Sequence, residues 1–301
     1  MLPLVQYTEH MIRMTGTAPL TNIVQMLSGY SIEVNHSDSK ALESAERRLS
    51  PGTEVFLTWI PGTNPMDMVK AASRLRRAGL LPVPHVAARH LESSAQLDQF
   101  AARLAEEAGV DRILLIGGDR SQPVGPYDSS LAVMQTGVFQ KRAITRMAIA
   151  GFPEGNPNIP EPALEEALRT KLKFAASAGL QLSIVTQFCF SAQPIVAWLR
   201  RIRGQGIDSP VRVGLAGPAS LVTLARYAVR CGIGNSIHVL SEHPSFARLL
   251  TEKGPEPIIR EIAASTGEKN GKLPSGVAGL HFFVFGGFNK TVDWINAELS
   301  D

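Results

Sequence analysis

Six of the apolar runs in this sequence contain, or end in, a polar residue that could take part in chemistry. Glu33 is the most informative, because it lies inside the run Ser-Ile-Glu-Val. Burying a carboxylate costs free energy unless the group is paired or protonated, and burial favours the protonated form. A proton-bearing glutamate suits general acid catalysis near neutral pH. The structural alternative is an internal ion pair between Glu33 and an arginine.

The other five runs follow the first along the chain and share this pattern. Their polar residues are Thr58, His85, Asp119, Glu154 with Asn156, and Gln187. A single residue of this kind usually satisfies a neighbouring backbone group, but six on successive runs favour a common site. Glu33, His85 and Asp119 could also bind a metal, which their spacing neither supports nor excludes. Because the sequence contains no metal-binding motif, we predict no metal site.

Eight short apolar runs, separated by amphipathic stretches, would position these residues. Several runs are apolar almost throughout, which is typical of strands buried on both faces. Strand–helix units of roughly 25–35 residues, repeated eight times, predict an α/β fold, a parallel (β/α)8 TIM barrel. A doubly wound sheet is the main alternative. The runs are Tyr30–Val34, Glu54–Trp59, Leu80–Val86, Arg112–Gly117, Met147–Phe152, Leu180–Phe188, Val211–Ala216 and Leu280–Phe285.

We predict a single barrel domain over residues 1–301, with an N-terminal helical extension over residues 1–28. Extra helices are expected between the seventh and eighth strands, in the long stretch 219–278. Among the helices, Ser93 or Ser94 can cap one that Gly109 closes, and Pro162 occupies the first turn of another.

The composition excludes several classes of protein. Of the 301 residues, 44% are apolar and 19% are charged, which argues against disorder. A net charge of +3 gives no electrostatic footprint for a nucleic acid. No apolar run approaches the ~18–20 residues that cross a bilayer, and we see no signal peptide. Cys189 and Cys231 form no CxxC pattern. We therefore expect a cytoplasmic protein without nucleic-acid or membrane partners; a homo-oligomer is compatible with the sequence.

Several short motifs occur in a characteristic order. They are Ser-Ile-Glu33, Pro84-His85, Gly118-Asp119, Phe152-Pro-Glu-Gly-Asn-Pro157, Thr186-Gln-Phe-Cys-Phe190 and His281-Phe282. In this order they resemble the methylenetetrahydrofolate reductase family, over about residues 30–296. The resemblance implies the interconversion of 5,10-methylenetetrahydrofolate and 5-methyltetrahydrofolate, a step of one-carbon metabolism linked to methionine biosynthesis.

The resemblance also implies roles for individual residues. Glu33 would be the general acid that assists ring opening to a 5-iminium cation, and Asp119 would help to stabilise that cation. Asp119 and Gln187 would hold the pterin of the folate substrate, and loss of such paired polar contacts is severe. Phe188 would contribute to the same substrate site. Tyr227 aligns with an aromatic residue that stacks on folate or nicotinamide; a half-buried structural residue is the alternative.

In that family, hydride normally passes through FAD. The matching flavin positions are Thr58, His85, Ile116, Gly118, Asp119, Tyr127 and Phe152, and Asn156 stands at a usual histidine. The diphosphate site is degraded, because the usual Arg-Gly-Asp reads Gly117-Gly118-Asp119 and two charged helix residues read Leu168 and Ala175. Each lost charge-assisted hydrogen bond is worth ~1.5–3 kcal/mol.

Two hydride sources therefore remain open, reduced FAD and direct transfer from NAD(P)H. One alternative function is a non-redox barrel that binds folate and transfers a methyl group. A non-catalytic folate-binding barrel is the other.

Overall fold

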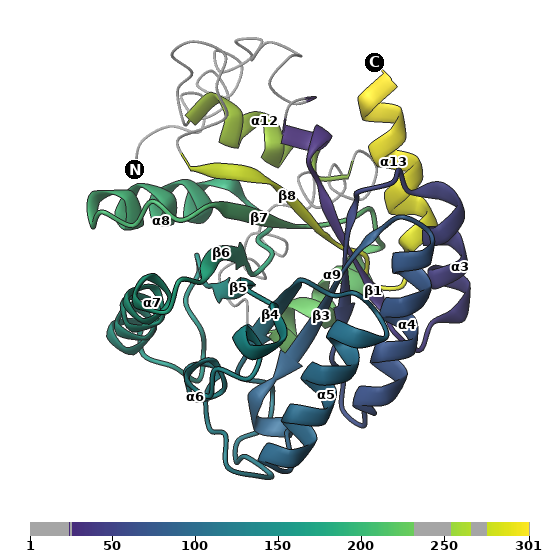
Figure 1. Ribbon diagram of the computed structural model, residues 1–301. Helices are drawn as coiled ribbons and strands as arrows, with labels where there is room; N and C mark the ends of the chain where they lie inside the picture. The colour runs from purple at the N-terminus through teal and green to yellow at the C-terminus, as the bar shows by residue number, and fades with distance from the viewer. Residues whose placement is uncertain (1–23, 25, 232–253, 266–275, 301) are drawn as a thin grey trace, which may run out of the picture.

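The computed structural model shows a closed barrel of eight parallel strands in sequence order, with helices outside (Figure 1). It describes residues 24, 26–231, 254–265 and 276–300, with side chains omitted for 228–231. Each strand pairs in parallel with the next, and β1 pairs with β8 to close the ring. The predicted (β/α)8 TIM barrel is therefore confirmed.

All eight predicted strands are present, with small shifts of their ends. The sixth strand stops at Thr186 rather than Phe188, so Gln187 and Phe188 lie at the mouth. The eighth ends at Phe283, because Phe285 takes a left-handed backbone with φ of 47°. The strands are β1 Ser31–Asn35, β2 Glu54–Thr58, β3 Leu81–Ala87, β4 Arg112–Ile116, β5 Arg146–Gly151, β6 Gln181–Thr186, β7 Val211–Ala216 and β8 Val277–Phe283.

The helices begin and end where local signals place them. The Ser93 hydroxyl accepts a hydrogen bond from the Gln96 amide at the start of α5, as predicted. Pro162 lies in the first turn of α7. The α-helices are α3 Ser39–Arg48, α4 Pro65–Arg77, α5 Ser94–Glu106, α6 Ser130–Gln135, α7 Glu161–Ser177, α8 Ala192–Gly204, α9 Leu221–Cys231, α12 Glu256–Ser265 and α13 Phe288–Ser300; η1 Ala88–His90 and η2 Gln140–Arg142 are 3₁₀ helices.

In the described part of the stretch between β7 and β8, α9 and α12 are helical, which confirms the expected extra helical segment. The Arg200 side chain of α8 donates to the Ser265 carbonyl at the end of α12. Of the predicted extension over 1–28, only residues 24 and 26–28 lie within the described part, and they are helical. Met26 and Leu27 are fully buried there.

The apolar side chains form two cores. The larger one fills the space between the strands and the surrounding helices. A smaller one lies inside the barrel and consists of Phe56, Val83, Leu114, Ala148 and Val185. Inward and outward side chains alternate along each strand, so each second residue faces the axis.

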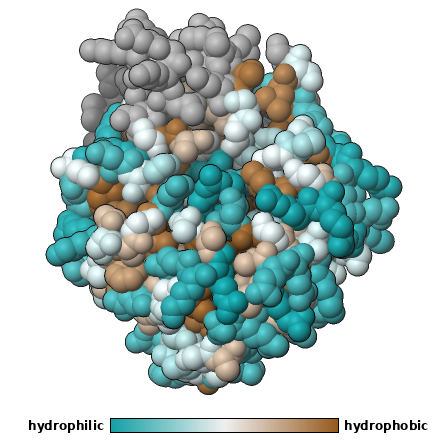
Figure 2. All heavy atoms as spheres, viewed as in Figure 1, coloured by the Kyte–Doolittle hydropathy of each residue, from teal (hydrophilic) through white to brown (hydrophobic). Residues whose placement is uncertain are grey.

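The face seen in Figure 2 is largely hydrophilic, with smaller apolar patches between. Among the described helices, none combines enough length with enough apolar character to cross a bilayer.

Gly214 of β7 permits a close approach between strands. A Cβ there would overlap the Thr186 carbonyl oxygen and lie 2.8 Å from Phe283 Cε2. Gly204, at the end of α8, has no such neighbour within 4 Å. We expect Gly214→Ala to lower the free energy of unfolding by about 1–3 kcal/mol through overpacking. Gly204→Ala is the control and should be neutral or stabilising by up to about 1 kcal/mol. Urea denaturation measures both, and equal effects would contradict the packing argument.

Candidate active site

Glu33 projects from β1 into the barrel and lies between two buried histidines. Its Oε1 atom is 3.6 Å from Nε2 of His85 on β3 and 3.4 Å from Nε2 of His281 on β8. The Glu33 side chain is 14% exposed, against 8% for His85 and 0% for His281. Within the described residues, neither Nε2 atom has a hydrogen-bond partner. Catalytic contacts of this length often tighten only when a substrate binds.

Ser31 holds the Nδ1 side of the His281 ring. Its Oγ atom lies 2.9 Å from His281 Nδ1 and 3.4 Å from the Leu280 carbonyl oxygen, to which it donates. The other ring nitrogen, Nε2, faces Glu33. In the tautomer with the proton on Nδ1, Nε2 is an acceptor toward Glu33.

Burial keeps His85 neutral. The loss of hydration lowers its pKa from 6.5 to about 4, with His281 acting in the same direction and the Glu33 carboxylate opposing it. Phe56 packs against both histidines, since its ring centroid is 4.5 Å from that of His281 and 6.1 Å from that of His85. It is also the residue of β2 that pairs with Glu33 of β1. Among the described residues, Glu33 lies beside His85 and His281, and no arginine pairs with it as the sequence-based alternative would require.

An aromatic wall stands above the Glu33 site, formed by Phe188, Phe283, Phe285 and Tyr227. Phe188 lies next to Phe283 and Phe285, with ring centroids 5.2 and 4.9 Å apart. Tyr227 of α9 stacks on Phe285 at 4.3 Å. Phe283 also meets His281 edge to face at 4.9 Å. The wall therefore joins two predicted substrate residues, Phe188 and Tyr227, to the histidine beside Glu33.

Asp119 lies on the rim of the mouth rather than beside Glu33. Its side chain is 60% exposed, and Oδ1 accepts from His90 Nε2 at 2.6 Å. Gly118 has φ of 91°, and a Cβ there would lie 2.9 Å from the His90 ring, so glycine allows this close approach. Arg89 steadies the same loop, because its Nε and Nη1 atoms donate to the carbonyls of Asp128 and Arg120.

Gln187 is half-buried at the mouth. Its backbone N–H donates to the Gly151 carbonyl at 2.8 Å. Its side-chain Oε1 accepts from the Phe188 amide at 3.2 Å. The side-chain NH2 group makes no hydrogen bond within the described part of the chain, so it is available to a ligand.

The other predicted cofactor positions are dispersed. Thr58 and Ile116 end β2 and β4 and are half-buried at the mouth. Tyr127 is buried and donates to Ser94 Oγ at 2.9 Å, at the start of α5. The Asn156 side chain accepts from the Asn158 amide within a tight turn. Their contacts with a cofactor stay predictions.

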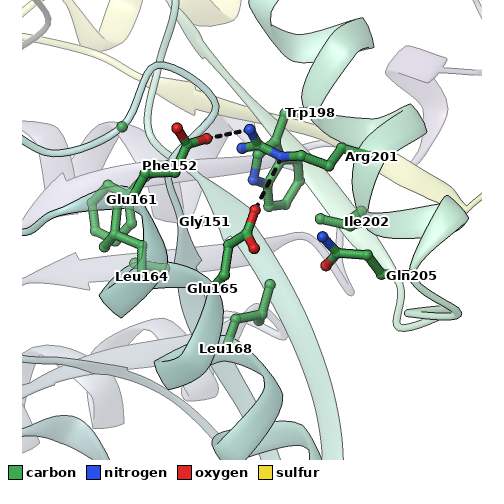
Figure 3. A pocket seen from close by; sticks show the side chains of 12 residues that line it. Gly151, Phe152, Glu161, Leu164, Glu165, Leu168, Trp198, Arg201, Ile202 and Gln205 are labelled. Carbon is green, nitrogen blue, oxygen red and sulfur yellow. Dashed lines mark hydrogen bonds and ion pairs between the residues drawn. The ribbon is translucent and has the colours of Figure 1, made fainter.

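Phe152 lines a narrow crevice between α7 and α8, with Leu164, Leu168 and Trp198. Figure 3 shows Arg201 in this crevice, bridging Glu161 and Glu165. The one arginine that lines the crevice is thus already paired with two carboxylates.

A tightly bound FAD would need cations around its diphosphate, and the residues at the expected positions do not supply them. Leu168 and Ala175 are apolar and Gly117 has no side chain. Arg89 Nη2 lies 3.5 Å from where a Cβ at Gly117 would be, so one guanidinium lies beside this position, with its Nε and Nη1 atoms bonded to carbonyls. Lys171 of α7 is half-buried, and desolvation lowers its pKa. The residues at the three expected positions carry no charge themselves, which is a poor fit to a diphosphate. The described residues also contain no cluster of three or more metal-ligating side chains.

Sequence reasoning overlooked Ser31, Phe56, Phe283 and Phe285 as parts of the site. Strand alternation contained a usable signal, since Ser31 lies two residues before Glu33 and Phe283 lies two after His281. In the sequence, His281 is part of the motif on the eighth strand, but no role was assigned to it. Its contact with Ser31 joins residues that are 250 positions apart.

Comparison with known proteins gives partial matches. No protein-family model matches the chain. Methylenetetrahydrofolate reductase 1 of Schizosaccharomyces pombe is 25% identical over 204 residues, 64% of this chain and 31% of that protein. A 3-methyl-2-oxobutanoate hydroxymethyltransferase of Acidothermus cellulolyticus is 28% identical over 171 residues, 55% of this chain and 58% of the enzyme. The chain thus spans less than two thirds of either relative, and the similarity to both is distant.

The buried His85 predicts a pH dependence of stability. The unfolded state binds a proton with a pKa near 6.5 and the folded state with one of about 4. Between these values the unfolded chain holds more protons, so stability falls as the pH falls. We expect His85 to contribute a loss of about 3 kcal/mol between pH 6.5 and 4. His85→Gln should remove this part of the slope in urea denaturation series. An unchanged slope in the variant would contradict the assignment.

Proposed function

We propose that this chain is an oxidoreductase that interconverts 5,10-methylenetetrahydrofolate and 5-methyltetrahydrofolate. The observation that carries the proposal is Glu33, held between two buried histidines at the inner end of an aromatic-lined mouth. The motifs of the chain and the partial match to a methylenetetrahydrofolate reductase give further support.

Glu33 acts as the general acid. In the proposed reductive direction, its proton goes to the amine nitrogen that leaves as the five-membered ring opens. The bond between that nitrogen and the one-carbon unit breaks, and the exocyclic carbon becomes part of a 5-iminium cation. Hydride then adds to this carbon and gives the 5-methyl product. A low-dielectric site strengthens the attraction between the resulting carboxylate and the cation.

His281 exchanges a proton with Glu33, and Ser31 positions His281 for this exchange. In this proposal the Ser31 hydroxyl, 2.9 Å from His281 Nδ1, accepts a hydrogen bond from Nδ1–H, so that Nε2 is an acceptor toward the carboxyl group. That imidazole nitrogen can accept a proton from Glu33 or return one to it between turnovers. Ser31 is therefore a positioning residue, because it acts through His281.

The aromatic wall and two polar side chains hold the pterin. A planar pterin ring would pack against Phe283, with the buried Phe188 ring behind it and Tyr227 at the outer end of the wall. The Gln187 NH2 group and the second carboxylate oxygen of Asp119 would then hydrogen-bond to its amide and amino edges. Such edge contacts discriminate strongly, because an unmatched analogue leaves buried polar groups unpaired.

The proposed hydride donor is NAD(P)H, which delivers hydride directly to the iminium carbon. This choice follows from the poor fit of the described residues to the FAD diphosphate. The nicotinamide ring would share the aromatic mouth with the pterin. The reaction balances, because hydride from the donor and a proton from Glu33 together convert the methylene group into a methyl group and a free amine.

One observation favours a second candidate function, a barrel that transfers a one-carbon unit without redox chemistry. The chain is 28% identical, over 171 residues, to an enzyme named for hydroxymethyl transfer. A transferase of this kind would need the pterin contacts but no hydride donor. Oxidation of NAD(P)H coupled to methylenetetrahydrofolate reduction would exclude it as the main activity.

Replacement of the acid tests the mechanism. We expect Glu33→Gln to lower kcat by about 10²–10⁴-fold, since the amide keeps the shape but cannot donate a carboxylic proton. Methyltetrahydrofolate binding, measured by calorimetry, should change little. The control is Glu43→Gln on the exposed face of α3 (Glu43 is 55% exposed), which should leave both unchanged. Full turnover by the Glu33 variant would disprove the assignment.

The hydride source is tested by the spectrum of the purified protein. We expect no flavin absorbance, together with oxidation of NADH or NADPH when methylenetetrahydrofolate is added. Added FAD should not raise the rate. A yellow protein whose activity is lost on flavin removal would overturn direct transfer while leaving the role of Glu33 intact.

A further inference from the structure

A second cavity lies inside the barrel at the opposite end from Glu33. Its volume is about 210 Å³, far more than the ~10–15 Å³ that a single water molecule requires. Phe56, Val83 and Ala148 form its apolar part. Branched, bulky side chains usually fill this part of a (β/α)8 barrel. Here Ala148 and Ser183 are small, so the space stays open.

Five charged side chains at the lower end of this cavity form a row in which positive and negative charges alternate. Arg146 contacts Asp111 at 2.9 Å, and Asp111 pairs with Arg112 at 2.9 Å. Arg112 in turn pairs with Glu54, and Glu54 lies 2.8 Å from Arg212. This row of five charged side chains crosses the barrel from β5 through β4 and β2 to β7. It contains three arginines and two carboxylates, so it carries one positive charge in excess.

Three hydrogen-bond donors along this wall have no partner among the residues that the structure describes. Arg146 donates through Nε to Gln181 and through Nη1 to Asp111, which leaves Nη2. Arg212 uses Nη1 for the Gly29 carbonyl and Nη2 for Glu54, which leaves Nε. Ser183 Oγ has no partner among the described residues. Arg146 and Gln181 are exposed at the opening of the cavity, so a ligand can enter from solvent.

We propose that this cavity binds a short-chain aliphatic monocarboxylate. One carboxylate balances the single excess positive charge and accepts from Arg146 and Arg212, for which the planar guanidinium is well suited. The aliphatic part then covers Phe56, Val83 and Ala148. Inorganic phosphate matches less well, because it has no apolar part and brings more charge than the site lacks.

This site is independent of the folate proposal, because it lies at the other end of the barrel and its test measures binding without turnover. The probe is 3-methylbutanoate, titrated calorimetrically and in thermal unfolding. We expect saturable binding with a dissociation constant of about 1 mM, as for a ligand of this size, and a rise in Tm. The alcohol 3-methylbutan-1-ol, of the same shape but uncharged, should not bind, and phosphate should bind more weakly.

Two variants locate the binding. Arg146→Met should weaken it at least about tenfold by removing a charge-assisted contact. Ala148→Leu should abolish it by filling the cavity, and it tests the site even if the arginine variant folds poorly. Arg77→Met, at the exposed end of α4, is the control and should bind as the original chain does. Absence of binding, equal binding of the alcohol, or full binding by Ala148→Leu would each overturn the proposal.

Discussion

A carboxyl group inside a barrel must keep a proton or meet a cation, and Glu33 lies between two imidazoles that bear on that choice. His85 is too deeply buried to charge near neutral pH. His281 contacts Ser31 through Nδ1, and its Nε2 atom faces the carboxyl group. The chemistry proposed for the mouth depends on this arrangement, because ring opening needs a proton from Glu33 and a neighbouring group that can return it. Phe56 and Phe283 pack against the His281 ring and hold it in place.

The two ends of the barrel treat charge in different ways. At the mouth, one carboxyl group lies between two imidazoles and near aromatic rings, and among the described residues no arginine or lysine pairs with it. At the base, carboxylates and guanidiniums form a continuous row in which each carboxylate contacts two arginines. Burial opposes the ionisation of Asp111, but Arg112 and Arg146 outweigh it and lower the pKa of its carboxyl group. The carboxylates of the base are therefore neutralised by guanidiniums, whereas Glu33 has only imidazole neighbours.

The fold could be predicted from the sequence, and so could the unusual position of Glu33, whereas the contacts around Glu33 could not. Apolar runs and caps such as Ser93 depend on nearby residues, so local patterns were sufficient for the strands and helices. Glu33 was unusual because a carboxyl group lies within an apolar run. The pairing of Ser31 with His281 depends on closure of the ring between β1 and β8, which no local pattern encodes. Phe285 has a left-handed backbone, which the apolar run Leu280–Phe285 did not indicate.

Phe56 separates the histidines from the lower cavity, since its ring contacts His85 and His281 and the residue also lines that cavity. The residue is 2% exposed, so it is part of the packed interior as well as a partition. A smaller side chain at this position would remove core packing and enlarge the lower cavity toward Glu33. Substitution here would therefore cost stability and also bring solvent toward the carboxyl group from below.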